Sequence, residues 1–226
     1  MSKNPARTIK AVVFDIDGTL TEHNSWYAFT RDIGGSEAEH LAIYEGQRKG
    51  DIGLEEAKQR LLEIWQRSGK ANRKDILAIY KNWDIRPEAY PLAEWLRASG
   101  YHTCLITGSV RIYAQIIANK LEVKDFYANA NLYFNNNNEL ESFHYDTDQA
   151  SVKVKQFALF CEKYNLKPNE CVPVGDGDND IGLFKLTGNG ILVDNNKVSE
   201  ALYKSAWKTV SNLSEVKELI QTNYFS

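Results

Sequence analysis

Cysteine is scarce in this sequence, and the few cysteines are not arranged as metal or redox motifs. Three occur among the 226 residues, all in apolar runs and without a CxxC spacing: Cys104, Cys161 and Cys171. An odd set of this kind supports neither a disulfide framework nor a zinc site. We therefore expect reduced thiols buried in the protein core.

The chain also lacks a strong charge bias and a long apolar run. Lysine and arginine number 27 and aspartate and glutamate 30, so the formal net charge is only −3. Such a charge gives no general attraction to nucleic acids or anionic membranes. No segment approaches the roughly 18 apolar residues that span a bilayer, and residues 1–10 carry charges without the apolar core of a signal peptide. These absences predict a cytosolic protein without nucleic-acid or membrane partners.

Glycine and proline are too infrequent for a disordered or fibrous chain. The 14 glycines and 5 prolines accompany 43% hydrophobic and 12% aromatic residues, a composition typical of a globular protein. At about 150 residues per domain, the length suits one large domain or a domain with a sizeable insertion.

Three apolar segments end abruptly in polar sequence: residues 11–14 before DIDGT, residues 101–106 before TGS, and residues 171–174 before GDGDND. Each pattern is typical of a buried strand that leads into a functional loop. Further strands are predicted at residues 190–193 and 207–210, and segments with helical periodicity lie between the strands: residues 92–96, 112–121, 152–164 and 198–203. This alternation predicts an α/β fold with a doubly wound parallel sheet, in which ligands bind at the carboxyl ends of the strands.

Two segments interrupt the alternation of strands and helices. Residues 22–86 show only amphipathic helical patterns, which predict an inserted helical cap. Residues 131–144 contain two short apolar runs around four asparagines, a pattern that predicts a β-hairpin. We therefore expect a catalytic core of residues 1–21 and 87–226 and a cap domain of residues 22–86.

The loops at the strand ends would bring acids, hydroxyls and an amide together: Asp15, Asp17, Thr107, Ser109, Asp176, Asp178, Asn179 and Asp180. Two carboxylates about 4 Å apart repel by roughly 4 kcal/mol at an effective dielectric near 20, so such a cluster needs a cation, a proton or separation. Mg²⁺ is the simplest cation, with Asp15 and Asp176 as carboxylate ligands. The Thr107 hydroxyl, the N–H groups of Gly108 and Ser109 and a lysine would donate to a phosphate.

Other common sites that use acids or glycines do not fit this pattern. An EF-hand that begins at Asp176 would need glycine at Ile181 and glutamate at Thr187. The sequence contains neither GxxxxGK[ST] nor GxGxxG. P-loop and dinucleotide-binding sites therefore lack their glycine scaffolds.

Four motifs resemble, in order and spacing, those of the haloacid dehalogenase superfamily of Mg²⁺-dependent phosphatases: FDIDGTLT (Phe14–Thr21), LITGS (Leu105–Ser109), Lys153 and VGDGDND (Val174–Asp180). The helical insertion after the first motif and the hairpin before Lys153 are similar to the phosphoserine-phosphatase-like branch, which has a helical cap of the C1 type. The resemblance covers nearly the whole chain and implies the same α/β core.

The resemblance implies that Asp15 is the nucleophile, which forms an aspartyl-phosphate, and that Asp17 is the general acid and base. It implies a Mg²⁺ site made by the Asp15 and Asp176 carboxylates and the backbone carbonyl of Asp17. The implied phosphoryl-binding residues are Thr107, Gly108, Lys153 and Asn179, and Asp180 would orient the metal ligands. Lys153 and Lys155 lie about 200° apart around a helix, so only one can face the site, and the spacing to Asp176 favours Lys153.

The sequence departs from the phosphoserine-specific pattern in the predicted cap. Asn24 stands where the resemblance implies an acidic residue, although Glu22 is close. Leu61 stands where it implies an arginine, with Arg60 one position before. These departures argue against phosphoserine as the substrate. Trp26 follows the first loop into the cap and either lines the substrate entrance or packs the first cap helix.

The leading hypothesis is a Mg²⁺-dependent phosphomonoester hydrolase for a small phosphorylated metabolite, with an aspartyl-phosphate intermediate. Phosphotransfer to an acceptor hydroxyl uses the same intermediate and stays open as an alternative. A phospho-receiver signalling domain is an alternative from another class, but such domains are far shorter. A catalytically inactive binding protein is disfavoured, because every expected catalytic position has a competent side chain. The oligomeric state is not encoded in these patterns.

Overall fold

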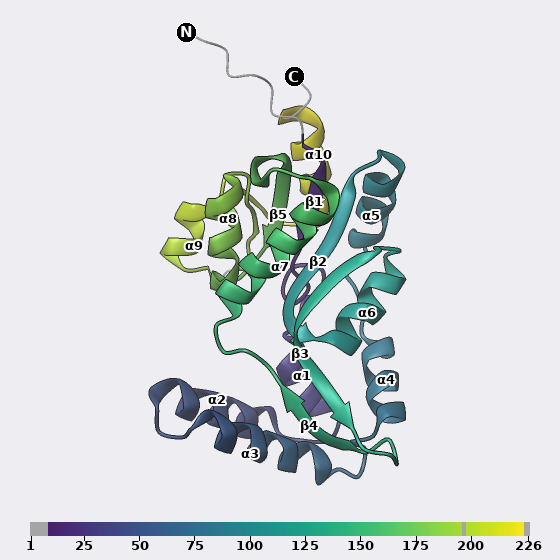
Figure 1. The fold of residues 1–226 in the computed structure, drawn as a ribbon, viewed down its shortest axis with the longest axis vertical. Helices are drawn as coiled ribbons and strands as arrows, with labels where there is room; N and C mark the ends of the chain where they lie inside the picture. Colours follow the sequence, from purple (N-terminus) through teal and green to yellow (C-terminus); the bar gives the residue numbers. More distant parts are fainter. Residues whose placement is uncertain (1–8, 196–197, 224–226) are drawn as a thin grey trace.

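The computed structural model describes residues 9–195 and 198–223, in which seven strands form one sheet in the order β4-β3-β2-β1-β5-β6-β7 (Figure 1). The strands are β1 (Ala11–Phe14), β2 (His102–Val110), β3 (Asp125–Phe134), β4 (Leu140–His144), β5 (Cys171–Gly175), β6 (Ile191–Val193) and β7 (Lys208–Val210). Neighbouring strands are parallel except for β3 and β4. The predicted α/β fold with a doubly wound sheet is confirmed. Residues 1–8, 196, 197 and 224–226 of the predicted core lie outside the described residues.

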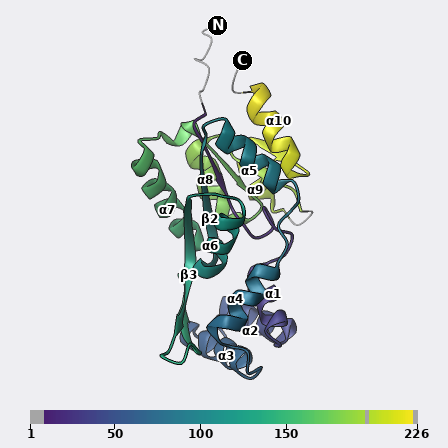
Figure 2. The ribbon, with the colours of Figure 1, turned by 90° about the vertical axis from the view of Figure 1, so that its right-hand side faces the viewer.

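Helices cover both faces of the sheet, because the central strands carry apolar side chains on both sides. One face is covered by α7 (Gln149–Tyr164) and α8 (Ile181–Thr187), with α9 (Glu200–Ser205) beside α8; the other is covered by α5 (Ala89–Ala98), α6 (Arg111–Lys120) and α10 (Leu213–Asn223) (Figure 2). Ala11 and Val13 pack with Phe157 of α7, whereas Val12 and Phe14 point into the opposite core. This alternation along β1 is the period of two expected of a strand.

The structure also shows the state of the cysteines and the character of the helices. The three cysteines are buried and free. The Sγ atoms of Cys161 and Cys171 lie 3.9 Å apart. Among the described helices, none combines the length and the apolar character that a membrane span requires.

The strand β1 lies in the middle of the sheet and positions the first loop. Phe14 is paired with Leu105 of β2 on one side and with Val174 of β5 on the other. Because these three strands are parallel, their carboxyl ends meet at one edge of the sheet. The polar residues that follow β1 and β5 and those near the carboxyl end of β2 therefore converge, as the sequence pattern predicts.

Two strands extend further than the sequence pattern indicates. β2 continues to Val110 through a bulge, because Thr107 and Val110 are paired with Ala128 and Ala130. The extra residue on β2 breaks the ladder at the TGS motif. β3 pairs first with β2 in parallel and then with β4 as the predicted hairpin. The parallel half of β3 was not predicted, because its YANAN sequence is not an apolar run.

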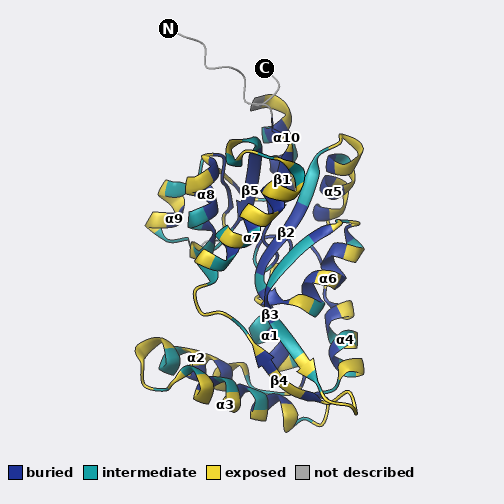
Figure 3. Cartoon of the chain, viewed as in Figure 1, coloured by how far each residue is buried: buried dark blue, intermediate teal, exposed yellow. Residues whose placement is uncertain are grey.

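Residues 25–82, which we call the helical segment, form four helices: α1 (Ser25–Asp32), α2 (Glu37–Lys49), α3 (Leu54–Gln66) and α4 (Arg73–Asn82). Asparagine or serine side chains cap three of them at the N-terminus: Asn24, Ser36 and Asn72. Such caps satisfy amide groups that have no partner within the helix. The helical pattern predicted for residues 22–86 is thus present, and Figure 3 shows exposed stripes along the outer sides of α2 and α3.

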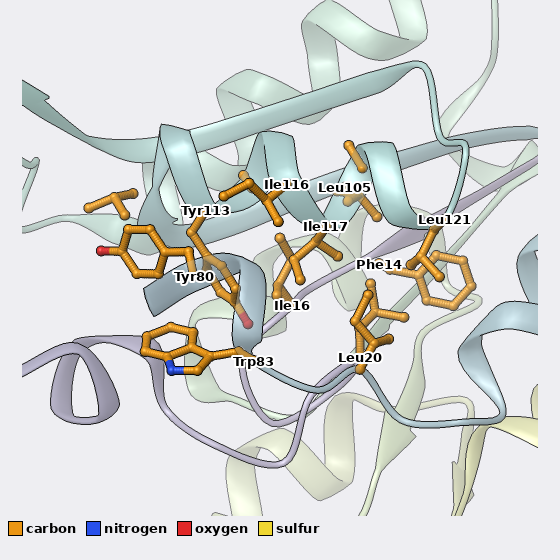
Figure 4. Close-up of a cluster of buried hydrophobic side chains, with 14 of the residues drawn as sticks. Phe14, Ile16, Leu20, Tyr80, Trp83, Leu105, Tyr113, Ile116, Ile117 and Leu121 are labelled. Carbon is orange, nitrogen blue, oxygen red and sulfur yellow. The ribbon is translucent and has the colours of Figure 1, made fainter. Parts of the chain in front are cut away.

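The helical segment is held to the rest of the molecule at two places. The hairpin packs on α3, where the Phe143 and Trp65 rings lie 4.8 Å apart and Gln66 Nε2 donates to the Leu140 carbonyl at 2.9 Å. On the other side, Tyr80 and Trp83 pack against Tyr113 of α6, with ring centroids 5.3 and 5.1 Å away (Figure 4). These aromatic contacts fix the helical segment above the carboxyl edge of the sheet.

Candidate active site

The loop after β1 is a tight turn that places Asp15 at the centre of the edge. The Asp15 amide donates to the Val174 carbonyl at 2.9 Å, and the amides of the following turn donate to the Ile16 carbonyl. Gly18 has a φ of +75°, and a Cβ there would lie 2.0 Å from Asp176 Oδ2. Glycine is therefore required for two reasons, the left-handed backbone and the close approach of the loop after β5.

Three carboxylates and one ammonium group form the core of the site. Oxygen atoms of Asp15, Asp176 and Asp180 all lie within 4.8 Å of one another. Lys153, which is 1% exposed, places Nζ 2.6 Å from Asp180 Oδ1 and 3.2 Å from Asp15 Oδ1. Lys155 is exposed. The structure thus brings Lys153, rather than Lys155, to the acids.

The pKa values of Asp15 and Asp176 are raised although Lys153 lies beside them. Burial raises the pKa of Asp15 to about 7; Lys153 acts against this, while Asp180 and Asp176 add to it. Burial and then the charge of Asp180 raise the pKa of Asp176 to about 6. Burial alone would lower the pKa of Lys153, but Asp15 and Asp180 outweigh it and raise that pKa. The cluster is therefore unfavourable as a set of anions unless protons or a cation neutralise it.

The same cluster fits a hard divalent cation. Asp15 Oδ1 is buried and accepts no hydrogen bond from the described residues, although Lys153 Nζ lies 3.2 Å away. A buried oxygen that accepts no hydrogen bond destabilises the fold unless a ligand such as a metal ion contacts it. Thr19 Oγ1 and Asn195 Nδ2 donate to Asp176 Oδ1 and Oδ2 at 3.1 and 2.7 Å and orient that carboxylate. Carboxylate oxygens oriented in this way are the ligands that Mg²⁺ prefers.

The side chain of Asp17 points away from the three clustered acids. Its Oδ2 accepts from the Ser25 amide at 2.9 Å and from Ser25 Oγ at 2.6 Å, and the Ser25 and Ser109 hydroxyls are 2.5 Å apart. Burial raises the pKa of Asp17 to about 7; the Ser25 hydroxyl lowers it and the Asp15 charge raises it. A carboxyl group with this pKa can hold or release a proton near neutral pH, as general acid–base chemistry requires.

The bulge of β2 places Thr107 and Gly108 beside this cluster. Thr107 is buried, and its Oγ1 accepts from the Ser109 amide at 3.1 Å. The Ser109 N–H, expected as a phosphate donor, is therefore already bonded within the loop. A Cβ on Gly108 would lie 2.4 Å from Gln149 Oε1, so Gly108 allows the start of α7 to approach.

Asn179 links the acids to the start of α7. Its Oδ1 accepts from Lys153 Nζ at 3.2 Å, and its Nδ2 donates to Gln149 Oε1 at 3.1 Å. Asp180 is held by Lys153 and by the Gly177 amide, which donates to Oδ2 at 3.3 Å. The sequence-predicted residues therefore converge, with the Asp17 side chain beside the cluster rather than in it.

Sequence reasoning missed four residues that contact the site: Thr19, Ser25, Gln149 and Asn195. Thr19 belongs to the first motif and Ser25 follows the Asn24 cap, so their positions carried a weak signal. Gln149 and Asn195 reach the site only through the tertiary fold. No local pattern marks them.

A cavity of about 590 Å³ opens between the helical segment and the loop after β5. Residues of α1, α2 and α3 line one side, and residues 145–150 and 177–179 line the other. Asn179 and Gln149 stand where the cavity meets the acid cluster. Leu61 of α3 lines the cavity, whereas Arg60 points away and contacts Glu56 at 2.5 Å.

Known proteins with similar sequences and folds point to one group of enzymes. A phosphoserine phosphatase of Idiomarina loihiensis is 25% identical over 190 residues, which cover 80% of this chain and 80% of that protein. A HAD family hydrolase of Salmonella enterica serovar Typhi superposes with a TM-score of 0.78 at 16% identity, covering 96% of this chain and 73% of that chain. A substrate-bound phosphoserine phosphatase superposes with a TM-score of 0.72 at 19% identity, covering 93% of this chain and 98% of that chain.

The family assignment rests on a match over most of the chain. The model of haloacid dehalogenase-like hydrolases matches residues 9–188, which include the loops after β1 and β5, the bulge of β2 and Lys153. The chain belongs to the haloacid dehalogenase-like hydrolase family and to its phosphoserine-phosphatase-like branch.

Proposed function

We propose that this phosphatase is a Mg²⁺-dependent phosphomonoester hydrolase that acts through an aspartyl-phosphate on Asp15. One observation carries the proposal: the buried Asp15 carboxylate lies among Asp176, Asp180 and Lys153 with an oxygen that accepts no hydrogen bond from the described residues. Such an oxygen is available to a metal ion or to phosphorus. The family membership supports the reaction class.

In this proposal Asp15 attacks phosphorus in line with the leaving oxygen. The O–P bond of the ester breaks while a carboxylate–phosphorus bond forms, and Asp17 gives its proton to the leaving alkoxide. Water then attacks the aspartyl-phosphate, Asp17 takes the water's proton, and inorganic phosphate and free Asp15 result. The raised pKa of Asp17 and its bonds to Ser25 support this role, because they hold a proton carrier beside the nucleophile.

Four residues are proposed to bind the phosphoryl group: Thr107, Gly108, Lys153 and Asn179. Lys153 supplies a full positive charge, and Asn179 contacts Lys153 at 3.2 Å. Mg²⁺ would be held by the carboxylates of Asp15 and Asp176 and by the Asp17 carbonyl, with Asp180 orienting these ligands. When bound, the ion would offset negative charge on the phosphoryl oxygens.

We also propose a division of the chain into a catalytic core, residues 1–21 and 87–226, and a cap, residues 22–86. The cavity between the helical segment and the acid cluster supports this division, because it would enclose a small phosphorylated metabolite. A location in the cytosol is part of the proposal and is supported by the three free cysteines.

The test measures phosphate release from a panel of small phosphomonoesters, with Mg²⁺ and with EDTA, for the wild type and Asp15→Asn. We expect release that needs Mg²⁺ and falls by at least about a thousandfold in Asp15→Asn, because the nucleophile is removed. Asp51→Asn, a change of an exposed acid of the helical segment, is the matched control and should retain activity. Undiminished release by folded Asp15→Asn would contradict the proposed nucleophile.

Phosphotransfer is tested in the same assay by adding acceptor alcohols. A new phosphoester in place of inorganic phosphate would identify a phosphotransferase. A phospho-receiver would instead accumulate an aspartyl-phosphate that persists for many minutes. A catalytically inactive binding protein is disfavoured because the catalytic candidates converge in one site.

A further inference from the structure

The cavity between the helical segment and the acid cluster reaches the proposed phosphoryl site. Asn179 lines the cavity and also accepts from Lys153, which touches Asp15. Trp26 lines the cavity and donates its Nε1 to the Gly108 carbonyl at 3.4 Å. A phosphate ester bound at Asp15 would therefore direct its leaving group into this cavity, whose lining then decides which esters are accepted.

Aromatic rings make up much of the lining: Trp26, Tyr27, His40, Tyr44 and Tyr145. Trp26 and Tyr145 pack edge to face with centroids 5.6 Å apart, and so do Tyr27 and His40 at 4.8 Å. Burial lowers the pKa of His40 to about 4, and its Nδ1 lies 2.7 Å from Thr30 Oγ1. His40 is therefore a neutral ring at neutral pH, and the five rings together carry no positive charge.

The charged residues of the lining are acids. Asp148 and Asp178 line the cavity, and the described lining residues include no lysine or arginine. Asp178 accepts from Ser199 Oγ, and Asp148 accepts from the Ser151 amide as the cap of α7. The hydrogen bonds from Ser151 lower the pKa of Asp148. The cavity thus combines rings that attract cations with two negative charges.

Two cations that neighbour lining residues in the sequence, Lys58 and Arg60, are already paired. Lys58 contacts Glu55 at 2.8 Å and lies 5.7 Å from the centre of the Tyr145 ring. Arg60 contacts Glu56 outside the cavity, while the neighbouring Leu61 faces it. A carboxylate on the leaving group would therefore meet Asp148 and Asp178 without a free cation from the described lining.

We propose that the cavity selects phosphate monoesters of amino alcohols, whose leaving group carries an ammonium group and no carboxylate. The inference rests on the proposed phosphatase function and names its substrate class. Ammonium groups gain from aromatic faces and from nearby carboxylates. A second anion would lose water and be repelled.

The first test compares phosphoethanolamine, phosphocholine and phosphoserine, with 4-nitrophenyl phosphate as a reference. Phosphoethanolamine is phosphoserine without its carboxylate, so this pair isolates one charge. We expect kcat/KM for phosphoethanolamine and phosphocholine to exceed that for phosphoserine by about tenfold or more, because the carboxylate is repelled. Equal or better turnover of phosphoserine would overturn the inference.

The second test removes the two negative charges with Asp148→Asn and Asp178→Asn, singly and together. Asparagine is also a good helix cap and keeps an acceptor oxygen. We expect the ratio of kcat/KM for phosphocholine to that for 4-nitrophenyl phosphate to fall by about fivefold in the double variant. Glu94→Gln, on the exposed surface of α5, is the control and should leave the ratio unchanged. An unchanged ratio in the double variant would count against the inference.

The proposed hydrolase function and the proposed preference for amino-alcohol esters are contradicted by different results. Release from none of the four esters, 4-nitrophenyl phosphate included, would overturn the proposed hydrolase and the inference with it. Release from 4-nitrophenyl phosphate without a preference for the ammonium esters would overturn the inference alone. A preference for phosphoserine that is lost in Lys58→Met would also overturn it, by identifying Lys58 as a carboxylate site.

Discussion

Three carboxyl groups of the site have raised pKa values, and their ionisation lowers the stability of the metal-free protein. Asp15, Asp17 and Asp176 are shifted to about 7, 7 and 6, and burial is the largest cause in each. A group whose pKa is higher in the folded state than in the unfolded state loses stability as pH rises between the two values. Of these three, the Asp15 and Asp176 carboxylates lie in the acid cluster and therefore favour binding of a cation above neutral pH.

Asp176→Asn should raise the stability of the protein in EDTA. The free energy of unfolding should increase by about 1–3 kcal/mol at pH 8, because asparagine avoids the buried charge while Thr19 and Asn195 keep hydrogen-bond partners. The gain should shrink as pH falls from about 6 to about 4, since the wild-type carboxyl is then protonated in both states. Thermal unfolding from pH 4.5 to 8 measures it. A constant difference across this range would contradict the pKa shift of Asp176.

Gly18→Ala should disturb the site more than Gly50→Ala does. Both Gly18 and Gly50 have a positive φ, but a Cβ on Gly18 would collide with Asp176, whereas a Cβ on Gly50 would meet nothing within 4 Å. Each change should cost about 1–2 kcal/mol from the backbone. Only Gly18→Ala should also weaken Mg²⁺ binding, measured by calorimetry. Equal Mg²⁺ affinity in both variants would show that the loop contact is unimportant.

At the scale of elements, the β3–β4 hairpin supports the helical segment. Phe143 is buried between the Trp65 and Trp26 rings, at centroid distances of 4.8 and 6.1 Å. Phe143→Ala should lower the free energy of unfolding by about 3–5 kcal/mol, because a large buried ring is removed. Denaturant unfolding followed by tryptophan fluorescence measures this. Tyr133→Ala, on the same hairpin but 48% exposed, should cost far less, and a similar loss would refute this role of Phe143.

The elements also show what a sequence can and cannot reveal. Strands that end in DIDGT and GDGDND were predictable, because apolar runs followed by acids mark buried strands with functional loops. The parallel half of β3 was not, because Tyr127 to Asn131 alternates with small and polar residues and is stabilised by its neighbour β2. The bulge at Thr107 depends on the register with β3, which no local pattern specifies.

The same limit applies to the candidate site. Motif order and spacing marked Asp15, Asp176, Lys153 and Asn179 as candidates, and the structure brings them together. The contact between Asp17 and Ser25 depends on how α1 starts over the sheet, and its geometry could not be read from spacing. The cavity lining likewise comes from elements far apart in the chain.

At the scale of the whole molecule, Mg²⁺ should stabilise the folded state. Saturation at a hundred times Kd should add about 2.7 kcal/mol, which corresponds to a rise in Tm of roughly 5–10 °C for a chain of this size. EDTA should reverse the rise. Asp176→Asn should respond less, because one proposed ligand is lost, whereas Glu94→Gln should respond like the wild type. A wild-type Tm that is the same with and without Mg²⁺ would argue against the metal site.

The central position of β1 also determines when the site can form during synthesis. β1 is made early, but one of its two neighbours, β5, begins only at Cys171. Until that segment has left the ribosome, one edge of β1 has no partner and resembles an open edge strand, which is prone to wrong pairing. We therefore expect a nascent chain that ends before residue 171 to need protection by chaperones, and Mg²⁺ affinity to appear only after Asp176 and Asp180 have emerged.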